Sequence, residues 1–247
     1  MSKLRIFTVI AIASVSVSCQ SKKALDLTAS ALHQALLDNN YAAFKVLALP
    51  ALVDKVSKQR FKLFSLALKA LGPIKDKSMT GINVKAGGVR SGTYKLTMTK
   101  GKADLKLTVV NGKLNAFNFD GADIVQASTT ARKALMLHAG EGFFKAVLQA
   151  SYDAFKAIAH PALIKEVSAE KFVKMAKMIK SFGDLKEKKQ LSAEIKDGKA
   201  VGRYRLEFAT RTLILEVSAV YGELVRYGFK PEGQAAKSAP PKNTKTP

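Results

Sequence analysis

The chain repeats itself at a shift of 111 positions, and this internal match constrains its fold more than any other feature. The motif Tyr41-Ala-Ala-Phe44 returns as Tyr152-Asp-Ala-Phe155. A repeat of roughly a hundred residues is longer than a solenoid repeat and has the size of a small domain. The sequence therefore predicts two tandem domains of one kind. The further matched pairs are Pro50 and Pro161, Leu52 and Leu163, Ser57 and Ser168, Phe61 and Phe172, Gly72 and Gly183, and, after a one-residue slip, Tyr94 and Tyr204.

Each copy opens with patterns typical of helices. Apolar residues at three- and four-residue steps predict one longer helix in each copy, which Gly140 and Gly142 are expected to weaken or break in the second. A shorter helix then ends before Pro50 or Pro161, because the residue before a proline avoids helical backbone geometry. The expected ranges are 25–38 and 131–149 for the longer helices and 41–48 and 152–159 for the shorter ones.

A third helix is marked at both ends in each copy. Ser57 and Ser168 stand where an N-cap is expected, and Gly72 and Gly183 stand where a left-handed C-terminal residue is expected. Four matched apolar positions lie between them and form one stripe, which we expect to pack in the core. The stripe consists of Phe61, Phe64, Leu68 and Leu71 in the first copy and of Phe172, Met175, Ile179 and Phe182 in the second.

The second half of each copy alternates apolar and polar residues, which predicts strands. Asn111-Gly112 and Asp197-Gly198 are strong signals for two-residue hairpin turns. Each copy is expected to end in about four antiparallel strands, with its helices packed on one side of a curved sheet. This arrangement is an α+β fold. The predicted domains are residues 24–121 and 129–232.

The order and motifs of each copy resemble the nuclear-transport-factor-two-like superfamily, also called cystatin-like. Within it, the copies are similar to a group of domains of unknown function from bacterial secreted proteins and lipoproteins. That group shows a short helix with Tyr-x-x-Phe, then a serine before an aromatic-bearing helix, then a glycine. The resemblance implies a sheet curled into a cone with a hollow at its wide end. It implies no fixed activity, since the superfamily includes both enzymes and binding modules.

The N-terminus has the features of a signal peptide. Lys3 and Arg5 precede an apolar run of about a dozen residues, which is shorter than the ~20 residues of a membrane-spanning helix. We therefore expect residues 1–18 to be removed on export. No later apolar run is long enough to span a bilayer.

The end of this segment, Ser16-Val-Ser-Cys19, resembles the lipobox of bacterial lipoproteins, apart from Ser16, where leucine is usual. The same residues also suit an ordinary signal peptidase that cuts before Cys19. We expect lipidation of Cys19, which is the only cysteine and so has no disulfide partner in the chain. The resemblance to lipoproteins that lack aspartate after the cysteine, as here with Gln20, implies outer-membrane retention.

The last residues, 233–247, consist largely of Pro, Lys, Ala, Ser and Thr without an apolar face. Such a segment cannot bury enough surface to offset the entropy of ordering. We expect a disordered tail.

No catalytic or metal-binding pattern emerges from the residues. The three histidines have no counterparts in the other copy: His33 aligns with Phe144, His160 aligns with Leu49, and His138 lies in the glycine-interrupted helix. Their spacing fits no metal site, and neither a phosphate-binding loop nor a nucleophile elbow is present. We therefore predict no metal and no cofactor.

Tyr94 and Tyr204 are the best polar candidates for the inside of a cone, because both recur on the apolar face of a strand. A buried tyrosine needs a partner for its hydroxyl, which either a ligand or the backbone could supply. The simpler interpretation is a core tyrosine bonded to backbone. Tyr41 and Tyr152 are expected to be packing anchors of the short helices.

The net charge is +22, with 41 Lys and Arg against 19 Asp and Glu. Such a field attracts polyanions, which outside the cytoplasm are lipid headgroups, lipopolysaccharide and cell-wall polymers. Nucleic acid is not expected, because the chain has no Trp and its aromatics fall on apolar faces. A solvated basic surface without a specific partner is the plainer alternative.

Three functions fit these observations. The first is a non-catalytic envelope lipoprotein, anchored in the membrane, whose paired domains bind a ligand, an anionic envelope polymer or another envelope protein. The second is a structural spacer. The third is an enzyme that uses the cone, with Tyr94 or Tyr204 as proton donor, and it has the least support.

Overall fold

A computed structural model describes the backbone of residues 3–233 and the side chains of residues 20–233. The predicted signal peptide, the side chain of Cys19 and the tail beyond Gly233 lie outside the described residues. The chain divides into a first unit, Met1–Arg132, and a second unit, Lys133–Pro247. None of the helices in the described part is long and apolar enough to cross a membrane.

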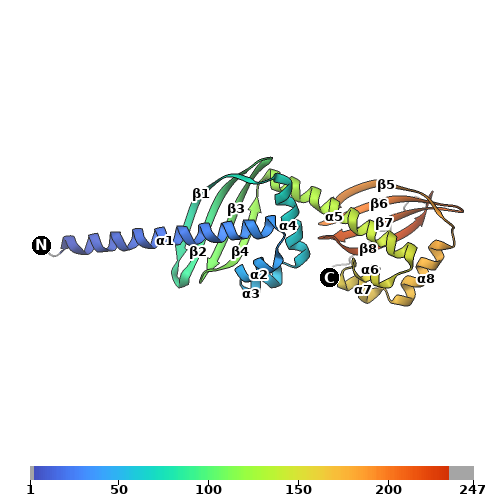
Figure 1. The fold of residues 1–247 in the computed structure, drawn as a ribbon, viewed down its shortest axis with the longest axis horizontal. Coiled ribbons are helices and arrows are strands. Elements are labelled where there is room, and N and C mark those ends of the chain that lie inside the picture. The colour runs from blue at the N-terminus through green and yellow to red at the C-terminus, as the bar shows by residue number, and fades with distance from the viewer. Residues whose placement is uncertain (1–2, 234–247) are drawn as a thin grey trace, which may run out of the picture. The chain divides into compact units, whose positions relative to one another are not determined.

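Both units have the same order of elements, with helices followed by a four-stranded antiparallel sheet, so the predicted α+β fold is confirmed (Figure 1). The strands follow one another in a simple meander, β1-β2-β3-β4 and β5-β6-β7-β8. The first unit contains α1 (Lys3–Leu37), α2 (Tyr41–Leu47), α3 (Pro50–Lys55), α4 (Lys58–Leu71), β1 (Ile74–Lys85), the short 3-10 turn η1 (Ala86–Gly88), β2 (Val89–Met98), β3 (Gly101–Val110) and β4 (Lys113–Asp120). The second contains α5 (Ala122–Gln149), which begins in the first unit, then α6 (Tyr152–Lys156), α7 (Pro161–Glu166), α8 (Ala169–Lys180), β5 (Leu185–Lys196), β6 (Lys199–Phe208), β7 (Thr212–Val220) and β8 (Glu223–Pro231).

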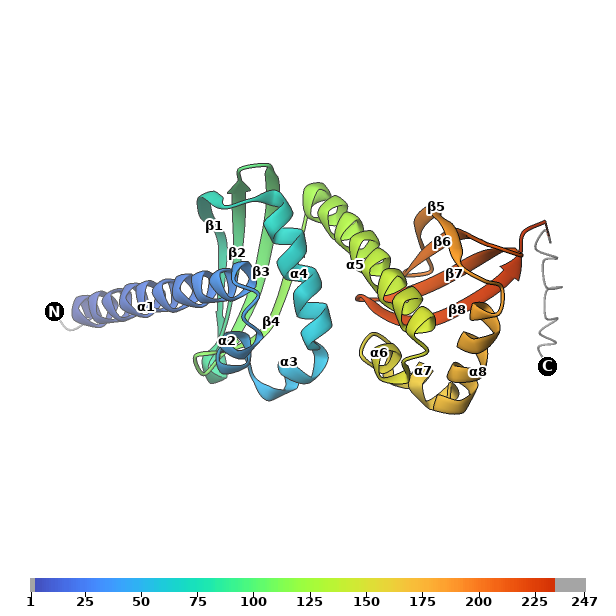
Figure 2. The same ribbon diagram turned by 45° about the vertical axis from the view of Figure 1, so that its right-hand side comes forward.

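In each unit a long helix crosses one face of the sheet (Figures 1 and 2). Leu25, Leu32 and Leu36 of α1 are completely buried, and they face the inward residues of the strands. Met136, Phe143 and Val147 of α5 are likewise buried in the second unit. The hydrophobic core of each unit therefore lies between its long helix and its sheet.

The local signals at the ends of α4 and α8 act as predicted. The hydroxyls of Ser57 and Ser168 accept hydrogen bonds from the backbone N–H groups of Arg60 and Lys171, respectively. Gly72 has a positive φ of 80°, which glycine adopts without strain. The Asn111-Gly112 and Asp197-Gly198 turns also have positive φ at both residues, as a two-residue hairpin of type I′ requires.

The prolines do more than end the preceding helix. Pro50 and Pro161 each begin a further short helix, α3 and α7, which the sequence analysis did not predict. Proline suits the first turn of a helix because its fixed φ is helical. It lacks a backbone N–H, but the N–H groups of the first turn have no partner within the helix in any case. His160 precedes α7, and its Nδ1 accepts a hydrogen bond of 3.2 Å from the Ala162 N–H.

The expected break at Gly140 and Gly142 is wrong, because α5 is continuous from Ala122 to Gln149. A methyl group at Gly140 would lie 2.8 Å from the Tyr204 hydroxyl oxygen, and one at Gly142 would lie 3.2 Å from Ile158. These glycines let β6 and the chain after α6 approach the helix closely. They serve packing and do not end the helix.

We predict that Gly140→Ala lowers the free energy of unfolding of the second unit by up to about 2 kcal/mol. Alanine favours a helix by about 1 kcal/mol over glycine, but overpacking against Tyr204 costs about 1–3 kcal/mol. Denaturant unfolding of the single variant and of Gly140→Ala with Tyr204→Phe measures the coupling. A single variant that is more stable than the parent would show that Tyr204 moves aside at no cost.

Candidate functional site

Tyr94 and Tyr204 occupy equivalent positions beneath the long helices, on β2 and β6. Their side chains are 0% and 3% exposed, and neither hydroxyl has a hydrogen-bond partner among the described residues. Both are thus core tyrosines, as the simpler interpretation expected, but the backbone hydrogen bond that it also expected is absent among the described residues. Tyr41 and Tyr152 behave as predicted, since each donates a 2.8 Å hydrogen bond to a backbone carbonyl, that of Val56 or Val167.

The two buried tyrosines remain neutral at physiological pH. Burial, and to a lesser extent the charge of Glu141, raises the pKa of Tyr204 to about 12. Burial, followed by the nearby Asp26, also raises the pKa of Tyr94. Each hydroxyl can therefore donate a hydrogen bond, but neither is a ready source of phenolate. Neither tyrosine lines either of the cavities described below.

The first unit contains a cavity of about 250 Å³ between α1 and the strands β1, β2 and β3. Its lining is mostly apolar on the sheet side and polar on the helix side. This volume is just below the roughly 300–1,000 Å³ of typical ligand pockets, so the cavity suits only a compact ligand. Its lining residues are Ala29, Ser30, His33, Gln34, Ile74, Lys77, Leu96 and Leu105.

His33 and Lys77 supply the strongest polar chemistry of this α1 cavity. The Lys77 ammonium donates a 2.9 Å hydrogen bond to the Ser30 hydroxyl and lies 5.6 Å from the centre of the Tyr94 ring. It makes no ion pair within the described part of the chain. The Nδ1 atom of His33 is buried and has no hydrogen-bond partner among the described residues.

The protonation state of His33 follows from these surroundings. Burial, and then the charge of Lys77, lower the pKa of His33 below its ordinary value of 6.5. The imidazole is thus neutral at pH 7, and the lysine carries the positive charge of the cavity. A ligand with a carboxylate, or another group that accepts hydrogen bonds, would find a cation and an unsatisfied ring nitrogen beside an apolar floor.

The second unit has different side chains at the equivalent positions. Lys188 stands where Lys77 stands, but its ammonium bonds to the carboxylate of Glu141, which replaces Ser30. Phe144 replaces His33, is only 5% exposed, and lies beneath the Lys188 ammonium at 5.4 Å. In the second unit the ring of Phe144 therefore fills the space that is open beside His33 in the first. The carboxylate of Glu141 likewise neutralises the lysine that is unpaired in the described part of the first unit.

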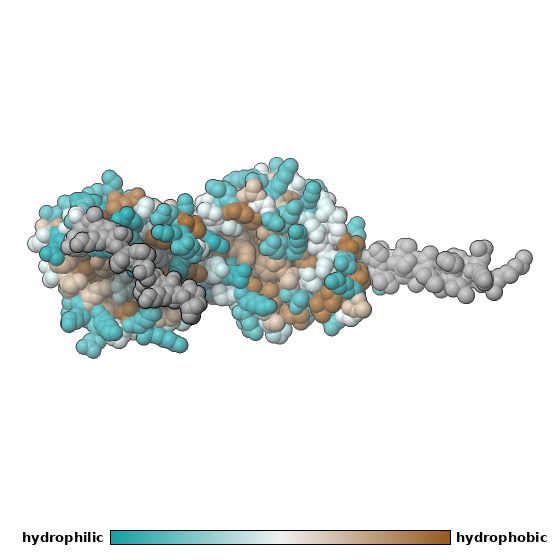
Figure 3. All heavy atoms as spheres, turned by 180° about the vertical axis from the view of Figure 1, so that it is seen from behind, coloured by the Kyte–Doolittle hydropathy of each residue, from teal (hydrophilic) through white to brown (hydrophobic). Residues whose placement is uncertain are grey.

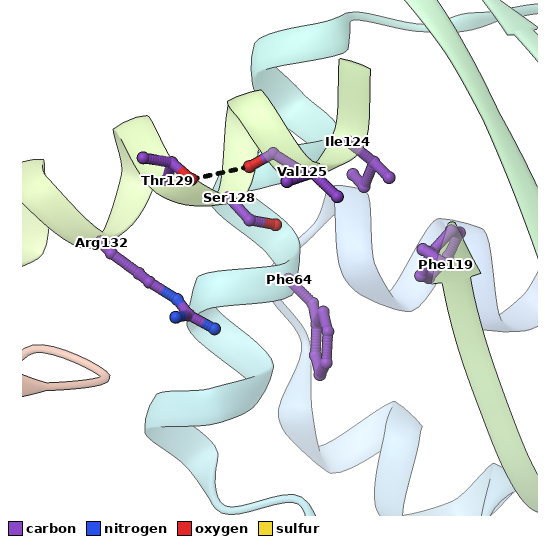
Figure 4. A pocket seen from close by; sticks show the side chains of 7 residues that line it. All are labelled: Phe64, Phe119, Ile124, Val125, Ser128, Thr129 and Arg132. Atoms are coloured by element: carbon purple, nitrogen blue, oxygen red, sulfur yellow. Dashed lines mark hydrogen bonds between the residues drawn. The ribbon is translucent and has the colours of Figure 1, made fainter. Parts of the chain in front are cut away.

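A second cavity, of about 210 Å³, lies where the start of α5 meets α4 and β4 (Figure 4). Phe64, Phe119 and Ile124 form its apolar side, and Arg132 extends toward the same space. The Thr129 hydroxyl donates to the Val125 carbonyl of its own helix at 3.0 Å, so it is already engaged. The polar lining thus depends mainly on Arg132, whose Nε is buried without a partner among the described residues.

The remaining polar candidates do not converge on a catalytic arrangement. His138 is exposed, and His160 caps α7. The described residues contain no group of three or more His, Cys, Asp or Glu side chains placed to hold a metal ion. The lysines predicted along the third helix of the second copy, Lys171, Lys174, Lys177 and Lys180, are all exposed.

We predict that Tyr204→Phe leaves the free energy of unfolding unchanged or raises it by about 1 kcal/mol at neutral pH. The change removes a buried hydroxyl without a hydrogen-bond partner among the described residues, and such a group costs about 1–3 kcal/mol. Tyr152→Phe is the matched control, since it removes a hydrogen bond and should lower stability by about 1 kcal/mol. A loss of stability in Tyr204→Phe equal to that of the control would mean that its hydroxyl is satisfied in solution.

The same tyrosines predict a loss of stability in alkali. A pKa raised by folding means that the folded state holds the tyrosine proton more tightly than the unfolded state. The contribution of the neutral Tyr204 to the free energy of unfolding is therefore fully present below pH 10 and is lost as pH rises from about 10 towards 12. Denaturant unfolding across this range should show a shallower decline for Tyr204→Phe than for the parent protein. Identical pH profiles would contradict a buried, neutral Tyr204.

Comparison with known proteins does not assign a function to this chain. No protein-family model, curated protein or solved structure matches this chain. The resemblance to the nuclear-transport-factor-two-like superfamily stays a prediction.

Proposed function

We propose that this protein is a non-catalytic binding protein of the bacterial envelope, whose first unit binds a small anionic amphiphile in the α1 cavity. The observation that carries the proposal is the pairing of Lys77 and His33, both with unused bonding capacity, over the apolar floor of Ile74, Leu96 and Leu105. A carboxylate on a compact hydrocarbon body matches both halves of this lining.

The contrast between the two copies supports a binding role for the first. Duplicated domains begin with the same core. The two copies now differ at one equivalent position, where Phe144 is packed in the second unit and His33 lines a cavity in the first. Phenylalanine at this place is compatible with the fold, as the second unit shows. Histidine at this place therefore has a reason other than packing.

Binding fits these groups better than catalysis. His33 has a pKa below 6.5 and a lysine as its charged neighbour, and no carboxylate of the described residues bonds to its Nδ1 or is a cause of its pKa shift. Such a histidine is a weak general base. The same neutral ring and ammonium are well suited to hold an anion without reacting with it. The proposal places the protein at the outer membrane, anchored through an acylated Cys19.

The first test is an intact-mass spectrum, under native conditions, of the protein extracted from its own envelope. A chain that begins at Cys19 and carries acyl mass supports the anchor, and a co-purified acid of low mass supports the binding role. An unmodified start would remove the anchor from the proposal. Ligand-free protein that also binds no added acid would favour the structural spacer.

We predict that His33→Phe weakens binding in the α1 cavity without destabilising the first unit. The ring should fill the cavity as Phe144 does in the second unit, so the dissociation constant of a probe such as octanoate should rise at least about tenfold, a change of about 1.4 kcal/mol. Calorimetric titration measures the binding, and denaturant unfolding measures the stability.

The matched control is His138→Phe, which changes an exposed histidine in the same way and should leave octanoate binding unaltered. Lys77→Met tests the other group, since it should weaken octanoate binding and reduce its dependence on salt. Unaltered binding in both His33→Phe and Lys77→Met would place the ligand elsewhere.

A further inference from the structure

One edge of the first sheet combines exposed apolar side chains with basic ones. Ile82 and Val84 of β1 are 40% and 45% exposed. By register they pair with Gly92 and Arg90 of β2 and point to the same face as Tyr94, the face against which α1 packs. In Figure 3, brown apolar side chains and teal polar ones meet at the right-hand edge of the first unit.

The equivalent residues of the second unit are partly buried against its core. Ala193 and Ile195 occupy the places of Ile82 and Val84, pair with Gly202 and Ala200, and pack against the buried cluster beneath α5. The larger Ile82 and the exposed Val84 of the first unit do not join its core in this way. Burial in the fold therefore does not account for apolar residues at these two positions.

Charge is distributed unevenly along the same sheet. The three acidic residues of its strands, Asp76, Asp104 and Asp120, lie together at the opposite end. Lys85 and Arg90 flank Val84, and neither makes an ion pair within the described residues. This end of β1 and β2 is therefore purely basic.

The turn of α1 that carries Leu25 lies over this end of the sheet. A methyl group at Gly92 would lie 3.4 Å from the Cδ1 atom of Leu25, and Gly92 pairs with Ile82. One turn earlier in the helix, Ser21 is completely buried, while Lys22 and Lys23 are exposed. Asp26, the nearest acidic residue on α1, interacts with Tyr94.

The position of Ser21 limits how far this surface can be from an anchor. Cys19 precedes Ser21 by two residues, which span about 3 Å in a helix. An anchor on Cys19 would therefore be attached two residues before the buried Ser21, with no long linker between the anchor and the fold. The surface would lie within reach of the headgroups in which the anchor is embedded.

We propose that Ile82, Val84, Lys85, Arg90, Lys22 and Lys23 form a docking surface for an anionic phospholipid bilayer, hereafter the β1 surface. The inference rests on the proposed envelope location and adds an orientation to it, with the first unit held against the membrane. The apolar residues enter the headgroup region, and the basic residues contact anionic headgroups. Each such lysine or arginine contributes about fivefold to binding near an anionic surface.

The test uses the chain from Gln20 onward, which lacks the anchor and retains every side chain that the structure describes. Its binding to vesicles of phosphatidylglycerol and phosphatidylcholine is compared with binding to phosphatidylcholine alone, by co-sedimentation at about 0.1 M salt. We expect binding to the anionic vesicles only, and a steep loss at about 0.5 M salt, where exposed charges are screened.

Two double variants test the β1 surface. Ile82→Glu with Val84→Glu should raise the dissociation constant for anionic vesicles at least tenfold, and Lys85→Gln with Arg90→Gln should raise it about 25-fold. The control is Met178→Glu with Leu191→Glu, which changes two apolar residues of the second unit that are 51% and 47% exposed. It should alter binding less than twofold, and the unfolding midpoint of each variant shows that the fold is retained.

The outcomes separate this inference from the proposed function. Absence of vesicle binding, or an equal loss in the control, overturns the β1 surface even if Cys19 carries acyl mass and octanoate binds. Vesicle binding with an unmodified Cys19 would keep the surface and remove the anchor. Octanoate binding should persist in all three double variants, because none of these residues lines the α1 cavity.

Discussion

The packing of a long amphipathic helix against the inner face of a curved sheet underlies each unit. Leu25, Leu32 and Leu36 lose all contact with water on α1, and burial of each such side chain contributes about 1.5–3 kcal/mol. The other features follow from this contact. The α1 cavity lies where the packing between α1 and the sheet is incomplete, and Tyr94 is buried where that packing is tight. The basic end of β1 carries Ile82 and Val84, which remain exposed.

The duplication supplies an internal comparison for every position of the site. In both units a lysine of the first strand reaches a side chain of the long helix 47 residues earlier. Lys188 bonds to the Glu141 carboxylate and lies over the buried Phe144. Lys77 instead bonds to the Ser30 hydroxyl, and His33 stands where the second unit has Phe144. The same scaffold thus supports a filled, neutral arrangement and an open, charged one, and the open one is the basis of the proposed binding role.

Much of the fold was predictable because its signals are local. Ser57 and Ser168 cap their helices, and Asn111-Gly112 turns a hairpin, through contacts within a few residues. Gly140 was misjudged because propensity favours a break there, whereas the decisive contact is with Tyr204, which lies 64 positions later in the chain. The sequence offered one indication of the α1 cavity, namely that His33 aligns with Phe144 of the second copy. It offered no reason to expect His33 and Lys77 at the same cavity.

The sequence by itself determined the duplication, the order of helices and strands apart from α3 and α7, the caps and turns, and the large positive charge, because each is a matter of composition or short-range pattern. The tertiary structure alone decided which polar groups are left without partners and which basic residues share an edge with exposed apolar ones. The physical reason is that burial and hydrogen bonding depend on what packs against a side chain. In this protein the strand partners of α1 in the cavity lie about forty to eighty residues away in the chain.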